Sequence, residues 1–422
     1  MRRYPEYKDS EVEWANALSP LPEGWHLVRL KYIAEITNSN VDKKTYEDGI
    51  PVRLCNYTDV YYREFITSDL DLMRATATEA EIERFSLRPG DVIITKDSEA
   101  WDDIAIPAVV TEELHGVVCG YHLAILRPRS GMVDGRFLFR ALQSSGVREQ
   151  FHVSAKGITR YGLSQHHIED ALIPVPPLGE QRRLADFLDR KTARIDTLIQ
   201  KKQALIDLLR EQRTALINRA VTRGLDPDVP MKDSGIEWLG SMPAHWEVKR
   251  VGYLCDMLTG FAFPSAEFGF DGESGGVPLV RGDNVTTGHL RWGARARYWS
   301  DVSPYERFLL ADGDVVIGMD GSRVGNNYAL ITSADLPLLL VQRVMRLRPV
   351  HVSPALLYHN IGTSFFKDYV NTVKSDPAIP HISPKDIHDF KIAVPPPEEQ
   401  RSLATYLEKA TRRIGRLIRR EQ

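Results

Sequence analysis

The 422-residue sequence lacks the features of a membrane or secreted protein. It contains no apolar run near the length needed to cross a bilayer. The first ten residues carry several charges and no apolar core, unlike a secretory signal. Cysteine is scarce: Cys55, Cys119 and Cys255 are odd in number and far apart, which fits neither a disulfide framework nor a zinc site. We therefore expect a cytoplasmic protein with reduced thiols and no membrane partner.

Motifs for catalysis are also missing. The sequence has no Gly-x-x-x-x-Gly-Lys-[Ser/Thr] loop for a nucleotide. It has neither Asn-Pro-Pro-Tyr nor Asp-Pro-Pro-Tyr, with which an amino-methyltransferase holds a flipped base. The segments at Asp312-Gly-Asp314 and Asp320-Gly-Ser are more typical of turns than of metal sites. The sequence predicts no catalytic residue, no metal site and no cofactor bound by this chain.

An excess of positive charge is missing overall, but not locally. With 54 Lys and Arg against 57 Asp and Glu, the net charge is −3. Residues 178–223 hold eleven Lys or Arg against six Asp or Glu, and residues 398–422 hold seven against four. These two segments are thus +5 and +3, which leaves −11 for the rest. A solvated helix face and a surface for phosphate or a partner are equally compatible with this pattern.

The first basic segment predicts a very long helix. Pro176 and Pro177 end what precedes it, and no proline or glycine follows Gly179 until Gly224. At about 1.5 Å per residue, its roughly forty residues would extend about 60 Å. Leucine or isoleucine recurs at the spacing of a helix that lies along a partner helix. This predicted seam comprises Leu184, Leu188, Ile195, Leu198, Leu205, Leu209 and Leu216.

The C-terminal segment repeats this pattern. Val394-Pro-Pro-Pro-Glu-Glu-Gln-Arg starts a second, shorter helix in the way that Val175-Pro-Pro-Leu-Gly-Glu-Gln-Arg starts the first. Its seam comprises Leu403, Leu407, Ile414 and Leu417. Because the second helix is shorter, two interpretations stay open. The N-terminal thirty residues could pack beside it, or the chain could be a shortened member of its kind.

The repeat extends over the whole chain and predicts two similar domains. Lys8-Asp-Ser-Glu-Val-Glu-Trp14 recurs as Lys232-Asp-Ser-Gly-Ile-Glu-Trp238, and Pro22-Glu-Gly-Trp25 as Pro243-Ala-His-Trp246. Other landmarks keep their order at similar offsets. We predict an α+β fold, a tandem duplication of a mixed domain, with the two long helices pairing as an antiparallel coiled coil. The expected boundaries are 1–177, 178–224, 225–396 and 397–422.

These motifs resemble the specificity subunit (HsdS) of type I restriction–modification systems over essentially the whole chain. The most specific marks are the paired Lys-Asp-Ser-x-[Val/Ile]-Glu-Trp and Pro-x-x-Trp segments and the paired Pro-Pro-[Leu/Pro]-x-Glu-Gln-Arg helix starts. Gly260-Phe-Ala-Phe263 is also similar to a segment of that family.

The resemblance implies a role in host defence in a bacterial or archaeal cytoplasm. Two target-recognition domains would each read one half of a split, asymmetric sequence in double-stranded DNA. The helices would set the spacer and dock two modification subunits, which methylate DNA, and restriction subunits would join. S-adenosylmethionine, ATP and Mg²⁺ would be bound by these partners, and this chain would contribute no catalysis.

Candidate DNA contacts are polar side chains in the loops where the two halves diverge. In the first domain they are Arg53, Asn56, Tyr57, Lys96, Ser98, Trp101, Lys156, Thr159, Arg160 and Tyr161. In the second they are Arg281, Asp283, Asn284, Arg323, Asn326, Asn327, Lys374 and Ser375. Two alternatives stay open: a shortened specificity subunit that self-associates, and a coiled-coil scaffold that binds no DNA.

Overall fold

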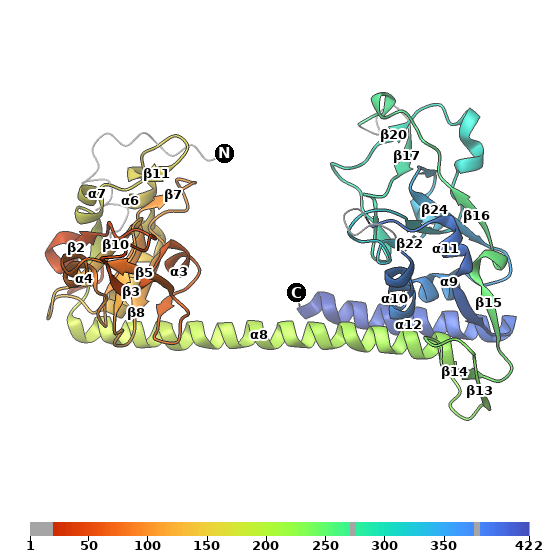
Figure 1. Ribbon diagram of the computed structural model, residues 1–422, viewed down its shortest axis with the longest axis horizontal. Coiled ribbons are helices and arrows are strands. Elements are labelled where there is room, and N and C mark those ends of the chain that lie inside the picture. Colours follow the sequence, from red (N-terminus) through yellow and green to blue (C-terminus); the bar gives the residue numbers. More distant parts are fainter. Residues whose placement is uncertain (1–19, 271–275, 375–379, 422) are drawn as a thin grey trace. The chain divides into compact units, whose positions relative to one another are not determined.

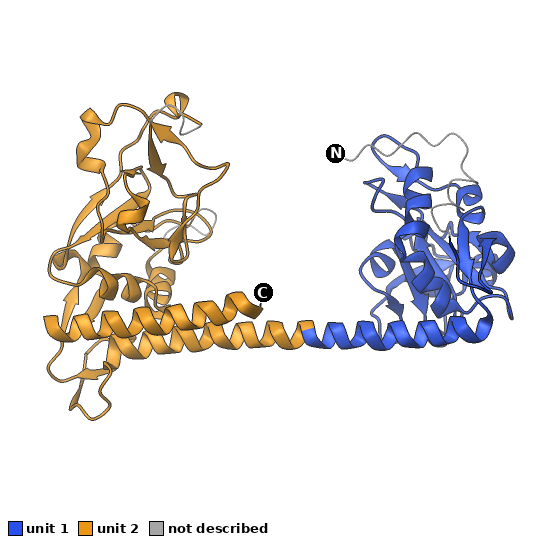
Figure 2. Ribbon diagram, turned by 180° about the vertical axis from the view of Figure 1, so that it is seen from behind, with its two compact units in different colours: residues 1–198 blue, residues 199–422 orange. Residues whose placement is uncertain are grey.

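A computed structural model of the chain describes residues 20–270, 276–374 and 380–421. The chain forms two compact units, Met1–Leu198 and Ile199–Gln422 (Figure 2). The boundary lies within one continuous helix, α8 (Leu178–Arg223), so each unit contains part of it (Figure 1).

The first unit is built on two sheets. The five-stranded sheet has the order β2-β10-β6-β8-β4, and the three-stranded sheet has the order β5-β3-β9. Strands β6, β8 and β9 are buried along their whole length, which explains their runs of apolar residues. The bounds are β2 (Ala34–Asn38), β3 (Ile50–Cys55), β4 (Phe65–Ile66), β5 (Met73–Ala77), β6 (Val92–Thr95), β8 (Pro107–Val110), β9 (Val117–Cys119) and β10 (Leu123–Pro128).

Two short strand pairs and six helices complete this unit. Strand β1 (His26–Arg29) pairs with β12 (Leu172–Val175), and β7 (Asp97–Ser98) pairs with β11 (Tyr161–Gly162). The helices are α2 (Leu30–Ile33), α3 (Tyr57–Tyr61), α4 (Glu79–Phe85), α5 (Gly135–Leu142), α6 (Ser145–Ser154) and α7 (Gln165–Glu169). Helix α4 begins with a capping box between Thr78 and Glu81, which satisfies backbone N–H groups of its first turn.

The second unit repeats this plan. Its sheets have the orders β16-β24-β21-β22 and β20-β17-β23, and β15 pairs with β25 as β1 pairs with β12. The bounds are β15 (Glu247–Arg250), β16 (Cys255–Thr259), β17 (Val277–Val280), β20 (Tyr298–Trp299), β21 (Val315–Gly318), β22 (Tyr328–Leu330), β23 (Leu339–Leu340), β24 (Val344–Pro349) and β25 (Lys391–Val394). The helices are α9 (Pro354–Ile361), α10 (Ser364–Val373), α11 (Pro384–Asp389) and α12 (Pro397–Glu421). Within the described residues, the strand orders correspond except that the four-stranded sheet has no counterpart of β4, and this correspondence confirms a tandem α+β fold.

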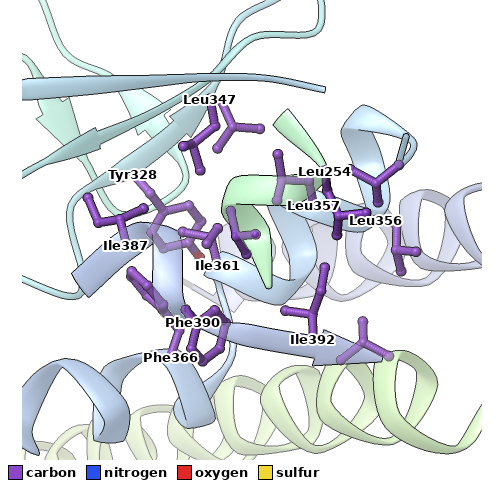
Figure 3. Close-up of a cluster of buried hydrophobic side chains, with 14 of the residues drawn as sticks. Leu254, Tyr328, Leu347, Leu356, Leu357, Ile361, Phe366, Ile387, Phe390 and Ile392 are labelled. Atoms are coloured by element: carbon purple, nitrogen blue, oxygen red, sulfur yellow. The ribbon is translucent and has the colours of Figure 1, made fainter. Parts of the chain in front are cut away.

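The second unit has additional short elements. A hairpin of β13 (Met231–Asp233) and β14 (Ser241–Pro243) follows α8, and a second hairpin joins β18 (Val285–Thr286) to β19 (His289–Leu290). The described residues also form the short 3₁₀ segments η1 (Val251–Tyr253), η2 (Ser265–Glu267), η4 (Ser303–Phe308) and η5 (Ser333–Asp335). The largest core cluster of the unit joins its sheet to α9, α10 and α11 (Figure 3).

The helix-start motif has a structural explanation in the first unit. Gln181, which is 1% exposed, accepts a hydrogen bond from the N–H of Asp134 (2.8 Å) and donates to the carbonyl of Pro176 (2.8 Å). The indole of Trp25 donates to Glu180 (3.2 Å). The Glu-Gln pair therefore fixes the first turn of α8 to the domain.

The second unit makes the same contacts. Gln400 accepts from the N–H of Ser353 (2.7 Å) and donates to the carbonyl of Pro395 (3.0 Å). The buried Trp246 donates to Glu399 (3.0 Å). The paired Pro-x-x-Trp and Glu-Gln motifs are thus two halves of one anchor, present twice.

Within the second unit, α12 runs beside the C-terminal part of α8 in the opposite direction (Figures 1 and 2). Near one end Lys202 forms an ion pair with Glu421 (3.2 Å). Near the other end Gly224 approaches Glu399. Both helices contribute to the largest core cluster of this unit, with Ile217 and Val221 from α8.

The predicted seam residues fall into four groups. Leu403 and Leu407 are buried in the core cluster of the second unit. Leu216, Ile414 and Leu417 line a groove of about 530 Å³ between α8 and α12, and Leu209 is half-buried. Leu184 packs on the core of the first unit. The middle of α8 is different, because Leu188, Ile195, Leu198 and Leu205 are exposed.

The described residues contain no helix that is long and apolar enough to cross a membrane. Nor do they contain a group of His, Cys, Asp and Glu side chains that could hold a metal ion. Cys55, Cys119 and Cys255 are buried free thiols, and burial raises the pKa of Cys255 to about 12.

Candidate nucleic-acid interface

The candidate site of the first unit lies where β6 ends and β7 pairs with β11. Figure 1 shows β7 and β11 at the end of this unit that lies away from α8. Two backbone hydrogen bonds fix Lys96 there. Its N–H donates to the carbonyl of His122 (2.9 Å), and its carbonyl accepts from the N–H of Leu163 (2.8 Å). His122 has a φ of +68°, a backbone conformation that is uncommon for residues other than glycine. Three chain segments therefore meet beside Asp97.

A chain of polar contacts starts at the carboxylate of Asp97. Its Oδ2 atom lies 2.9 Å from Lys96 Nζ and 2.6 Å from His122 Nδ1. The other ring nitrogen of His122, Nε2, lies 3.1 Å from Arg160 Nη2. A guanidinium can only donate, so Nε2 accepts from it and Nδ1 carries the proton that is donated to Asp97. Burial alone would raise the pKa of Asp97, but the hydrogen bonds from Lys96 and His122 outweigh burial and lower this pKa.

The loop that carries Arg160 is a narrow turn. Lys156 and Gly162 exchange two backbone hydrogen bonds (3.2 and 2.9 Å). A Cβ atom on Gly157 would lie 1.9 Å from the carbonyl oxygen of Arg160, so the turn requires glycine at this position. Lys156, Thr159 and Arg160 are exposed at its tip, and Tyr161 is half-buried in β11. The structure thus presents cationic and hydroxyl groups together at one edge.

Two further predicted residues lie beside this loop. Tyr57 is close to Ser98 and Arg160: burial raises its pKa, and these two neighbours act in the opposite direction. Ser98 is itself buried and accepts from the N–H of Ala100 (3.3 Å). Predicted contacts from three separate stretches of sequence therefore meet here.

The remaining predicted residues of the first unit have structural contacts. Asn56 caps α3 in a capping box with Asp59. Arg53 donates to the carbonyls of Ser68 (3.4 Å) and His115 (3.0 Å). Trp101 packs edge-on against His152, with 6.0 Å between ring centroids. These contacts are all to residues outside the cluster around Asp97.

The second unit has a corresponding cluster around Asp320. The N–H of Met319 donates to Arg343 (2.9 Å), and the carbonyl of Met319 accepts from Ile382 (3.0 Å), the same two bonds that Lys96 makes. Arg343 has a φ of +67°, nearly the value of His122 in the first unit. We call residues that make equivalent backbone bonds in the two units matched.

The side chains around Asp320 differ from those around Asp97. Oδ2 of Asp320 lies 3.1 Å from Nε of Arg343, and Oδ1 is hydrogen-bonded to Nδ1 of His381. The backbone of His381 forms a β-bridge with Asp320. In the first unit Gly162 pairs with Asp97 in the same way. In the first unit, histidine is at the strand start and arginine comes from the facing loop. In the second unit arginine stands just before the strand, and histidine occupies the facing position that is matched to Gly162.

A cavity of about 800 Å³ opens beside Asp320 and Arg343. Predicted contacts Arg281, Asp283, Arg323 and Asn327 line it, together with the aromatic rings of Phe263, Phe268 and Phe270 and with Arg297. Four arginines and two aspartates line the cavity, which gives the lining a net charge of +2. The guanidiniums of Arg281 and Arg297 lie over the rings of Phe268 and Phe270, at 5.7 and 4.5 Å from their centroids. Such a surface can bind a planar, electron-rich group or a phosphate.

The other predicted residues of the second unit are spread more widely. Asn284 is fully buried and holds the turn between Arg281 and Arg291, so the structure does not bring its side chain to the surface. Asn326 is half-buried in the loop after Arg323, and Lys374 donates to Asn371 (2.8 Å) at the end of α10. Ser375 lies outside the described residues.

Sequence reasoning missed five members of the two clusters. They are Asp97, His122, Asp320, Arg343 and His381. A signal was present, since His122 and Arg343 each stand just before an apolar strand at the repeat offset. That signal is weak because one residue is histidine and the other is arginine. Alignment of the two copies also cannot show that each side chain faces the aspartate of its own unit.

Comparison with known proteins identifies relatives of the whole chain. Residues 22–207 and 243–421 match the family model described as type I restriction modification DNA specificity domain. The MjaVIII specificity subunit of Methanocaldococcus jannaschii is 26% identical over 289 residues, 67% of this chain and 65% of that protein. The EcoAI specificity subunit of Escherichia coli is 29% identical over 181 residues, 42% of this chain and 30% of that protein. The chain thus spans less than two thirds of these two relatives.

Longer matches are more distant. The EcoKI specificity subunit of Escherichia coli K12 is 22% identical over 411 residues, 92% of this chain and 82% of that protein. The fold is similar to the HsdS subunit of Thermoanaerobacter tengcongensis, with a TM-score of 0.56 and 22% identity over 95% of this chain and 92% of the other. It is also similar to a chain from a study of complex assembly in the type I R-M system, with a TM-score of 0.69 and 21% identity over 95% and 94%.

Proposed function

Because the chain belongs to the family of type I restriction–modification DNA specificity domains, we propose that it is the specificity subunit of such a system. Each unit reads one half of a split, asymmetric sequence in double-stranded DNA. One observation carries this proposal: the same fold and the same anchor occur twice, whereas the polar clusters at the sheet ends differ in their side chains. Two domains with the same fold but different hydrogen-bonding side chains are suited to read two different DNA sequences.

The long helices set the distance between the two half-sites and dock the modification subunits. Pairing of α8 with α12 as an antiparallel coiled coil is supported by the burial of Leu403 and Leu407 and by the Lys202–Glu421 ion pair. Two modification subunits, which bind S-adenosylmethionine, associate with this chain, and restriction subunits bind ATP and Mg²⁺. This chain provides the sequence recognition and no catalytic step.

Methylation sequencing tests this function most directly. Cells that lack other modification systems are given this chain together with its genomic modification subunit, and adenine methylation is mapped. We expect a split motif that is absent when either protein is omitted. Replacing residues 225–396 by the corresponding domain of a relative should change one half of the motif and leave the other. Methylation of a continuous motif, or a motif that persists without this chain, would contradict the proposal.

A deletion in α8 tests the helix as the spacer. Residues 191–197 lie in the part of α8 that is almost entirely exposed, so removing this heptad keeps the helix phase and disturbs few contacts. It shortens the helix by about 10 Å, so the preferred spacer should change by about three base pairs. Alanine substitution of the exposed residues in the same segment keeps the length and serves as the control. An unchanged spacer in the deletion variant would rule out this role.

A self-associating subunit is the second candidate. It is favoured by the exposed apolar residues Ile195, Leu198, Ile199 and Leu208 in the middle of α8. In this case the purified chain forms a dimer through these residues, and light scattering gives twice the mass of the chain. The double substitution Ile195→Ser and Ile199→Ser should then restore the monomer. A monomer at all concentrations would exclude this candidate.

A further inference from the structure

The aspartate clusters have an unusual combination of features for a surface contact. Among the described residues, only Ala105, His122 and Arg343 are non-glycine residues with positive φ, and two of these three are matched. Each stands just before a strand, and its side chain contacts the aspartate of its own unit, Asp97 or Asp320. A backbone conformation that is disfavoured, and that recurs at one place in both copies, indicates a side chain whose direction matters.

The aspartate is not itself suited to contact DNA. A carboxylate repels phosphate, and in the major groove it can accept only from the amino groups of cytosine and adenine. Both carboxylates are largely covered, with 19% of each side chain exposed. Their contacts are taken by cations and by histidine. Their position therefore points to an indirect role, acting through a neighbour.

The neighbour that reaches outward is an arginine in each unit. In the second unit, Asp320 binds Nε of Arg343, and 69% of the Arg343 side chain is exposed. No side chain in the described part of the chain pairs with the two terminal amino groups of Arg343. In the first unit His122 transmits the hydrogen bond, because it donates to Asp97 and accepts from Arg160. Within residues 20–270, 276–374 and 380–421, Nη1 of Arg160 has no acceptor.

Resting on the proposed function, we propose that Asp97 and Asp320 are positioning residues for base-reading arginines. Asp97 acts through His122 on Arg160, and Asp320 acts directly on Arg343 and is oriented by His381. Each arginine donates two hydrogen bonds to O6 and N7 of one guanine, the base edge that matches a guanidinium. The first half-site and the second half-site therefore each contain a guanine whose recognition depends on the aspartate of that unit only.

The two aspartates can be tested with isosteric variants. Asp→Asn removes a negative charge near the DNA, so simple electrostatics predicts tighter binding to all sequences. Positioning predicts the opposite at one base pair. We expect Asp320→Asn to lower the preference for guanine at one position of one half-site by about 5- to 100-fold, and to leave the other half-site unchanged. Asp97→Asn should do the same in the other half-site.

The measurement is selection of bound duplexes from a randomised DNA pool by the full chain in complex with its modification subunit, followed by sequencing. Asp312→Asn is the matched control, since Asp312 is an exposed residue at the other end of β21 and carries the same charge. Arg343→Lys should lose the same guanine as Asp320→Asn, and the double variant should lose no more than either one. Thermal unfolding of each variant checks that the fold is kept.

The outcomes separate this inference from the proposed function. If the wild-type complex selects no split motif, the proposed function fails, and this inference fails with it. If a split motif is selected but Asp320→Asn and Asp97→Asn select it unchanged, only the positioning role is overturned. The same conclusion follows if either variant loses information evenly across both half-sites, or if Arg343→Lys and Asp320→Asn affect different positions.

Discussion

The two units share their frame and differ at the ends of their sheets. Both fix a long helix with a buried glutamine and a tryptophan–glutamate hydrogen bond, at nearly the same distances. At the sheet ends both keep an aspartate beside a residue of positive φ, which is histidine in the first unit and arginine in the second. The two units therefore share the position of the carboxylate, whereas the side chains that donate hydrogen bonds to it differ.

The shared frame predicts equal losses when the anchor is broken. Gln181→Leu and Gln400→Leu each remove the partner of a half-buried N–H and of a buried carbonyl. Each should lower the free energy of unfolding of its own unit by at least about 3 kcal/mol. Hydrogen exchange of peptides from β6 and β21 reports the two units separately.

The control for this pair is Gln203→Leu, an exposed position on α8, which should change stability by less than about 0.5 kcal/mol. A large loss for one anchor and none for the other would show that the frames are not energetically equivalent.

A buried ionisable position differs between the units. Arg140, at the sixth position of α5, binds Asp189 of α8 (3.0 Å), whereas the sixth position of α9 is the buried His359. Burial, and to a lesser extent the charge of Arg213, lowers the pKa of His359 to about 4. The unfolded chain takes up this proton near pH 6.5, so the stability of the second unit should fall by up to about 3 kcal/mol between pH 6.5 and 4.

His359→Gln should remove this part of the pH dependence in the second unit. His351→Gln, at an exposed position in the same unit, should not. The measurement is denaturant unfolding at several pH values, followed by hydrogen exchange in each unit. Equal pH dependence in wild type and His359→Gln would contradict the assignment.

The smallest expected difference lies within α8 itself. Ile217 is 6% exposed in the core of the second unit, and Ile199 is 59% exposed. Ile217→Val should therefore cost about 1 kcal/mol, whereas Ile199→Val should cost almost nothing in the chain alone. Thermal unfolding of the two variants compares them. A similar cost at both positions would indicate that Ile199 is also covered in solution.

Much of the frame was predictable because it depends on local signals. Proline pairs, the absence of glycine and the apolar spacing are enough to predict α8 and α12, and repeated motifs predict the duplicated fold. The exposure of Ile195 and Leu198 was not predictable. The seam spacing of leucine and isoleucine is the same whether or not a partner helix covers these residues. Asn284 was misplaced at the surface because a turn residue that satisfies backbone groups looks, in sequence, like one that faces solvent.

The clusters around Asp97 and Asp320 could not be predicted from the sequence for a different reason. Asp97 and His122 are 25 residues apart, and Arg160 is a further 38 residues along the chain. Only the pairing of β7 with β11 and the hydrogen bond from Lys96 to His122 bring them together. Sequence analysis selected Arg160 and Lys96 from their type, but the acidic residue between them could be recognised only from the fold.

The pairing of the first strand of each domain with its last strand has a consequence for inheritance. Because β1 lies against β12 and β15 against β25, the chain enters and leaves the globular part of each unit at one place. Two genetic crossovers at these strands would exchange the whole segment between them, while both partners of each tryptophan–glutamate hydrogen bond stay outside it. If each unit reads one half-site, as proposed, a single exchange of this kind would replace one half of the recognition sequence and leave the long helix and the other unit unchanged.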